Sequence, residues 1–177
     1  MRRPFGTLRP SRSGLFVGAV GLVALVACGG DDDGDEALRP LVDQIAPAMA
    51  AVDEARGGPQ QYFEVNATPQ FVNLFVADAA RERVAAYLYV DGELEPPTPP
   101  SAASGETFAA DAVTFDPDTI LDGLDEDLAD SDVVVFAVVA DAAGGVHYSA
   151  TVESARGGIL DVALAADGTV LSADPRS

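Results

Sequence analysis

The stretch VVVFAVVADAAGGVHYSATVE, residues 133–153, decides the fold. Residues 133–140 are almost wholly apolar, which indicates a central strand of the sheet. A glycine-containing turn at residues 142–145 follows, and residues 146–153 then alternate. One face carries Val146, Tyr148, Ala150 and Val152, and the other carries His147, Ser149, Thr151 and Glu153. The stretch therefore predicts two strands joined by a short turn, the second with one polar face.

Similar period-two runs lie on both sides of this stretch. They predict strands at residues 62–67, 71–78, 84–90, 159–164 and 169–171, and residues 107–115 add a further strand. Turns are predicted at Asp91-Gly92 and at residues 155–158. Four prolines between residues 94 and 106 indicate a stiff, extended connection rather than part of a core.

Two segments have helical period instead. In the first, Pro40 suits a first turn and Gly57 marks the end, while Pro47 should kink the helix or delay its start. Its apolar stripe consists of Leu38, Leu41, Val42, Ile45, Met49 and Val52. The second helix is predicted to begin after the N-cap Asp116, with Pro117 at its first position. Its stripe consists of Ile120, Leu121, Leu124 and Leu128.

These elements predict an α+β fold: a mostly antiparallel sheet with two amphipathic helices packed on one face. The five letters VADAA occur at residues 76–80 and again at 139–143. With the shared order of helix then strands, they suggest a degenerate tandem repeat, residues 37–94 and 107–177, joined by the proline-rich connection 95–106. This order is loosely similar to PepSY-type and beta-lactamase-inhibitor-type modules of secreted bacterial proteins.

The N-terminus has the features of a targeting signal. Arginines precede residues 14–27, fourteen uncharged residues that fit the apolar region of a signal peptide and are short for a membrane span. Leu25-Val26-Ala27-Cys28 follows and resembles the lipobox of bacterial lipoprotein precursors. The resemblance implies cleavage of residues 1–27, acylation of Cys28 and anchoring to the membrane outside the cytoplasm. An ordinary secretory signal or an uncleaved anchor is the alternative.

The segment after Cys28 is strongly acidic. Residues 29–36, GGDDDGDE, predict a flexible spacer that binds calcium loosely at most, and residues 37–177 form the globular domain. All 29 Asp and Glu follow Cys28 but only six arginines do, so the mature chain has a net charge of −23. Such a surface argues against nucleic acid as a partner. It permits a basic protein partner.

Residues with catalytic or metal-binding chemistry are sparse. The chain has one histidine and one cysteine, which argues against His/Cys metal sites. Residues 116–127, DPDTILDGLDED, depart from the spacing of a calcium loop. His147 and Ser149 share one strand face, but no sequence feature marks an orienting carboxylate or an oxyanion hole. Because the chain has 29 acidic residues, the sequence does not exclude a catalytic pair of carboxylates of the glycosidase type.

We therefore expect a non-catalytic, protein-binding lipoprotein of the cell envelope, without a cofactor or metal, anchored through Cys28. The alternative is a carrier of a lipid or other apolar ligand, which needs a large apolar pocket. The envelope protein partner is not identified by the sequence.

Overall fold

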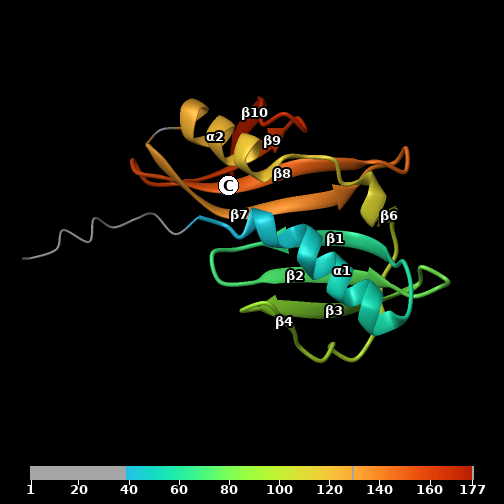
Figure 1. Cartoon of the computed structure of the whole chain (residues 1–177). Helices are drawn as coiled ribbons and strands as arrows, with labels where there is room; N and C mark the ends of the chain where they lie inside the picture. The colour runs from blue at the N-terminus through green and yellow to red at the C-terminus, as the bar shows by residue number, and fades with distance from the viewer. Residues whose placement is uncertain (1–38, 129, 177) are drawn as a thin grey trace, which may run out of the picture. The chain divides into compact units, whose positions relative to one another are not determined.

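The computed structural model describes residues 39–128 and 130–176, all within one compact unit that spans residues 35–177. This unit contains a mostly antiparallel sheet and two α-helices, so the predicted α+β class is confirmed (Figure 1). The signal peptide, Cys28 and the acidic spacer lie outside the described residues.

The helical elements are η1 (Val42–Gln44), α1 (Ile45–Arg56), η2 (Ala110–Ala112) and α2 (Pro117–Asp127). The strands of the first part are β1 (Gln61–Ala67), β2 (Val72–Ala77), β3 (Arg83–Val90), β4 (Glu93–Leu94), β5 (Ser101–Ala102) and β6 (Phe108–Ala109). Those of the second part are β7 (Ser131–Ala140), β8 (Val146–Ser154), β9 (Ile159–Leu164) and β10 (Val170–Pro175).

The sheet has the order β10-β9-β8-β7-β1-β2-β3-β4, and β5 and β6 pair with β3 and β1. The strands β7 and β1 lie side by side at its centre, with Val138 opposite Val65 and Phe136 opposite Ala67. The prediction that residues 133–140 form a central strand is therefore confirmed. Along the chain, α1 precedes the antiparallel run β1–β4 and α2 precedes the run β7–β10.

The start of α1 is delayed, as Pro47 predicts. A 3₁₀ turn covers residues 42–44, and the α-helix begins at Ile45, so Pro47 is its third residue. The N–H groups of a first helical turn have no partner within the helix, and proline costs no hydrogen bond there. The helix ends at Gly57, which adopts a left-handed φ of +78°.

A buried tyrosine ties α1 to β1. The Tyr62 hydroxyl lies 2.9 Å from Asp53 Oδ1 and 3.2 Å from the Met49 carbonyl oxygen, both of them acceptors. Burial raises the pKa of Tyr62, and the hydrogen bond and negative charge of Asp53 raise it further. Tyr62 is therefore a neutral donor at physiological pH, which keeps this link intact.

The N-terminus of α2 is capped as predicted. Asp116 Oδ1 accepts hydrogen bonds of 2.9 Å from both the backbone N–H and the hydroxyl of Thr119. The backbone hydrogen bond and then the side-chain one hold the pKa of Asp116 below its usual value. Pro117 occupies the first helical position, where its fixed φ is already helical.

The helix α2 approaches the β9–β10 turn so closely that only glycines fit. A Cβ added to Gly123 would lie 2.6 Å from the Gly168 carbonyl oxygen. A Cβ added to Gly168 would lie 2.5 Å from the Thr119 carbonyl oxygen, and Gly168 also has a φ of +83°. The helix backbone thus rests directly on the turn backbone.

The segment between the two runs of strands differs from expectation. Of residues 107–115, predicted as one strand, only Phe108–Ala109 is strand, and a 3₁₀ turn follows. The reason is competition for one edge of β1: β6 pairs with Gln61 and Tyr62, and β7 occupies that edge from Glu64 onward. The last strand is longer than predicted, since β10 continues to Pro175.

One hydrophobic core joins buried side chains from both helices and from seven strands. At its β7–β8 end, Phe115 makes edge-on contacts with Phe136 and Tyr148, with ring centroids 5.3 and 5.4 Å apart. The Tyr148 hydroxyl accepts a hydrogen bond from the backbone N–H of Thr114. These contacts hold the loop before α2 against the sheet.

Candidate functional site

The strand side chains that alternate with those of the core are partly buried or exposed, and we call them the half-exposed face. They alternate along β2, β3 and β8 with the side chains of the core. Its apolar part consists of Phe75 on β2, Val84, Ala86, Leu88 and Val90 on β3, and Val135, Ala137 and Val139 on β7. Its polar part consists of His147, Ser149, Thr151 and Glu153 on β8 with Asp161 on β9. An antiparallel sheet facing only water has polar residues at such positions, so the apolar part is unusual.

The register places these side chains in rows across the strands. In one row, Ala86 on β3, Phe75 on β2 and Glu64 on β1 are successive partners, and Val139 on β7 and His147 on β8 continue it. Side chains directly opposite one another on an antiparallel pair have Cβ atoms about 5 Å apart. The Glu64 side chain therefore lies between apolar neighbours on both adjacent strands.

A β-bulge in β1 creates a pocket on this face. The register with β2 shifts between Tyr62 and Glu64, so Phe63 is an extra residue. Such a bulge redirects side chains and is common beside functional sites. Here the consecutive residues Phe63 and Glu64 line the same pocket of about 220 Å³, together with Phe75, Val84, Ala103 and Ser104.

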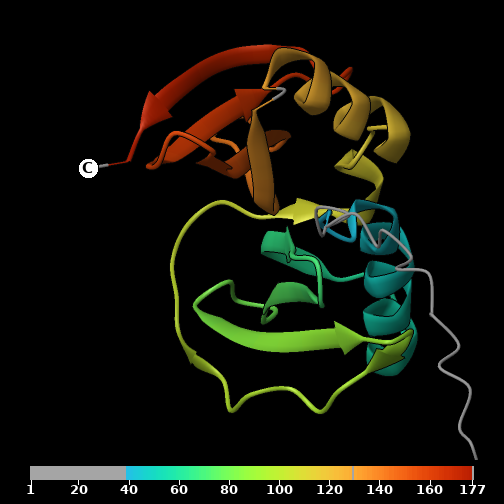
Figure 2. The ribbon, with the colours of Figure 1, turned by 90° about the vertical axis from the view of Figure 1, so that its left-hand side faces the viewer.

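The proline-rich connection supplies the other wall of this pocket. It runs along the outside of β3 (Figure 2), where Thr98 N donates to Ala86 O and Ala103 N donates to Glu82 O. Gly105 then passes over Phe63, and a Cβ on Gly105 would lie 3.9 Å from the Phe63 ring. The connection, predicted as separate from the core, thus covers the edge of β3 and bounds the pocket.

Two acceptors on β1 lack a partner among residues 39–128 and 130–176, and one of them, Glu64, lines the pocket. Within the described residues, no arginine lies within ion-pair distance of Glu64. Two residues further along the same strand, Asn66 has a buried Oδ1 without a hydrogen-bond donor. A buried acceptor without a donor costs free energy. Only the Glu64 carboxylate lines the pocket, so it is the group that favours an incoming donor there.

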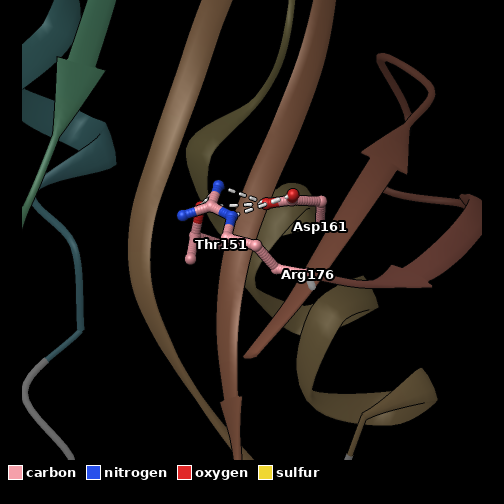
Figure 3. Close-up of polar contacts among 3 residues, drawn as sticks. All are labelled: Thr151, Asp161 and Arg176. Atoms are coloured by element: carbon pink, nitrogen blue, oxygen red, sulfur yellow. Dashed lines mark hydrogen bonds and ion pairs between the residues drawn. The ribbon is translucent and has the colours of Figure 1, made fainter. Parts of the chain in front are cut away.

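The polar part of the face ends in a small network (Figure 3). Arg176 forms an ion pair with Asp161, and its guanidinium donates to the Thr151 hydroxyl at 3.2 Å. Asp161 raises the pKa of Arg176 through the hydrogen bond and then through its charge. Because Arg176 follows β10 and its partners lie on β9 and β8, the network fastens the last strand to its neighbours.

Two other cavities are less suited to a ligand. One, of about 370 Å³, lies beside the end of α2, and its lining residues are mostly polar and include both acids and a base: Glu126, Asp127, Asp130 and Arg156. The other, of about 170 Å³, lies between α1 and η2 and includes Met49, Asp53 and Val113. The second is small, and the carboxylate in it already accepts from Tyr62 and from the Gln60 backbone.

The predicted site residues fall as follows. Cys28 lies outside the described residues, as do the acids of 31–36. His147 is exposed and Ser149 is partly exposed on the same face of β8, and no hydrogen bond joins them. In the part of the chain that the structure describes, no three His, Cys, Asp or Glu side chains gather as a metal site.

Sequence reasoning missed the pocket residues Phe63 and Glu64. The sequence hides the bulge, because Phe63, Val65 and Ala67 alternate as in a regular strand, whereas the structure buries Tyr62, Val65 and Ala67. A regular strand places residues two apart on one face, so a spacing of three requires an extra residue.

Comparisons with protein-family models, curated proteins and solved structures give no match. Neither α-helix of the described residues is both long and apolar enough to cross a bilayer.

Proposed function

We propose that this chain is an extracytoplasmic lipoprotein, anchored through Cys28, whose domain binds a protein partner and catalyses no reaction. The observation that carries the proposal is the apolar part of the half-exposed face. Partly exposed apolar side chains gathered on one face of a sheet are typical of interaction sites. Here they lie on β3, β2 and β7, away from the side chains that form the core.

The anchor rests on the lipobox-like residues 25–28 and on the spacer that follows them. Acylation by more than one chain holds a protein stably at a membrane. The test is Cys28→Ala. The wild-type protein should partition into detergent and carry the mass of acyl chains, and the variant should do neither. A wild-type protein without acyl mass would contradict the anchor.

We also infer that both helices pack on the same face of the sheet and that the two runs of strands form a degenerate tandem repeat. Support comes from the order of the strands, which reads as helix plus four-strand run on each side of the β1–β7 pair. Figures 1 and 2 draw α1 and α2 on the same side of the strands. A partner would then bind the opposite face, beside the part that the proline-rich connection covers.

The carrier alternative has less support. The apolar pocket of about 220 Å³ is smaller than the roughly 300–1,000 Å³ of pockets that enclose drug-sized ligands. The cavity of about 370 Å³ has a charged lining. The first pocket is too small for a lipid tail, and the second is too polar.

In-cell photocrosslinking tests the binding proposal. A photoreactive amino acid at Leu88, on the half-exposed face, should give one discrete adduct with an envelope protein. The same amino acid at Glu54, exposed on α1, is the control and should give none. Equal adducts from both positions, or none from Leu88, would contradict the proposal. Turnover in hydrolase screens that vanishes in His147→Ala would contradict the non-catalytic part.

A further inference from the structure

We propose that the bulge pocket of β1 receives an arginine side chain of the partner protein. This inference rests on the proposed function and names the chemistry that the half-exposed face recognises. The pocket combines two aromatic rings, Phe63 and Phe75, with the carboxylate of Glu64. Aromatic faces attract cations, and carboxylates pair with guanidinium groups through two parallel hydrogen bonds.

The register brings these groups within reach of one ligand. Glu64 and Phe75 are direct cross-strand partners, and the bulge adds Phe63 beside Glu64 on the pocket wall. A planar guanidinium that stacks on a ring can therefore also meet the carboxylate. An ammonium group is a point charge and does not stack in this way, so arginine fits better than lysine.

The size and surroundings of the pocket agree with this occupant. The pocket is open to solvent and has a volume of about 220 Å³, so a guanidinium can enter it from the surface with part of its stem. The apolar walls, Val84 and Ala103, suit the methylene groups of that stem. The chain's own nearby arginines have other acceptors: Arg83 donates to the Pro100 carbonyl oxygen and Arg81 to Gln61.

Charge and hydrogen bonding point to the same ligand. The Glu64 carboxylate on the pocket wall has no arginine partner within ion-pair distance among the described residues. The whole chain has a net charge of −19, which attracts a basic partner. A positively charged side chain that donates hydrogen bonds matches both the unpaired carboxylate and the net charge.

The experiment uses the full chain in detergent and the probe acetyl-Gly-Arg-Gly-amide. The methyl NMR signals of Val84 report occupancy of the pocket during the titration. Matched probes carry citrulline, which has nearly the same shape but no charge, or lysine. We expect saturable shifts with arginine, weaker binding with lysine and almost none with citrulline. Absent Val84 shifts, or equal affinity for arginine and either matched probe, would overturn the proposal.

Two variants separate the pocket from general electrostatics. Glu64→Gln should raise the Kd of the arginine probe by up to about fivefold, which is the upper range for the contribution of a partly exposed ion pair. Glu153→Gln changes the net charge equally, on the exposed part of β8 away from the pocket, and should have almost no effect. Equal losses in both variants would show that the net charge, not the pocket, attracts the probe.

The crosslinking experiment distinguishes this inference from the proposed function. If the adduct at Leu88 forms in wild type and in Glu64→Gln with equal yield, the partner exists but does not use the pocket. If the wild type forms no adduct, the proposed function itself fails. A yield that falls severalfold in Glu64→Gln but not in Glu153→Gln supports both.

Discussion

Replacing Gly168 by alanine should destabilise the domain far more than replacing Gly92 by alanine. Both glycines lie in β-turns with a φ of +83°, so the conformational cost for an L residue is the same. They differ in their surroundings. A Cβ at Gly92 meets nothing within 4 Å, and one at Gly168 would lie 2.5 Å from the Thr119 carbonyl oxygen of α2.

The magnitudes follow from these two terms. A left-handed conformation costs an L residue roughly 1–2 kcal/mol, and the gain from a stiffer unfolded chain offsets about 0.4–1 kcal/mol of it. Both variants share this cost. Only Gly168→Ala adds overpacking, which costs about 1–3 kcal/mol. In a domain of this size, that excess corresponds to a melting temperature lower by about 2 to 12 °C.

Urea unfolding followed by circular dichroism measures the difference. For Gly123→Ala, the sign of the change in the free energy of unfolding is the test. Alanine in a helix interior is normally more stable than glycine by about 1 kcal/mol. Here the new Cβ would lie 2.6 Å from the Gly168 carbonyl oxygen, so we expect destabilisation instead. Equal costs for Gly168→Ala and Gly92→Ala, or a stabilising Gly123→Ala, would refute the contact between α2 and the turn.

Three further predictions concern single contacts. Tyr62→Phe should lower the free energy of unfolding by about 1–2 kcal/mol, because it removes a buried hydrogen bond to the Asp53 carboxylate. The control Tyr87→Phe should lower it much less, because the Tyr87 hydroxyl has only a 3.4 Å contact with an arginine. Asp116→Asn should lower the melting temperature at pH 6, and the difference in melting temperature from wild type should narrow as the pH falls. The pKa of Asp116 is lower in the folded protein than its unfolded value of 3.8, so the charged carboxylate stabilises the fold fully above pH 3.8. This stabilisation is lost as the pH falls from 3.8 through the folded pKa. A gap independent of pH would contradict this. Arg176→Gln should speed amide hydrogen exchange at residues 172–174 with little change in the unfolding midpoint, and unchanged exchange there would show that the Asp161 network does not fasten β10.

The sequence patterns correctly predicted the strands and helix ends that depend on residues close together in the chain. The alternation of residues 146–153 and the apolar run 133–140 predicted the second face and the centre of the sheet, because side chains alternate in direction along a strand without bulges. The N-cap Asp116 and the delaying Pro47 were predictable for the same reason. Each acts within one helical turn.

Features that depend on distant partners were not predicted. Residues 107–115 have strand character, but β7 occupies the edge of β1 that a longer β6 would need. The proline-rich connection pairs with β3 at residues 101–102, which its composition alone does not reveal. The pocket combines this connection with a bulge on β1, so neither segment specifies it alone.

The repeated letters VADAA illustrate the limit of local similarity. In both copies the aspartate accepts backbone hydrogen bonds of the following turn: Asp78 from Glu82 N and Asp141 from Ala143 N. The copies end β2 and β7, however, which are the second and the first strand after their respective helices. The shared letters therefore reflect similar turns and do not align corresponding strands of the two runs.

The central claim is that the half-exposed face binds a partner protein in the cell envelope. Carbene footprinting of the full chain in native envelopes, compared with the purified protein in detergent, tests it most directly. We predict that labelling of residues 83–90 and 131–140 falls severalfold in envelopes, whereas the exposed end of α1, residues 54–56, is labelled equally in both. Equal labelling of β3 and β7 in the two samples would contradict the claim.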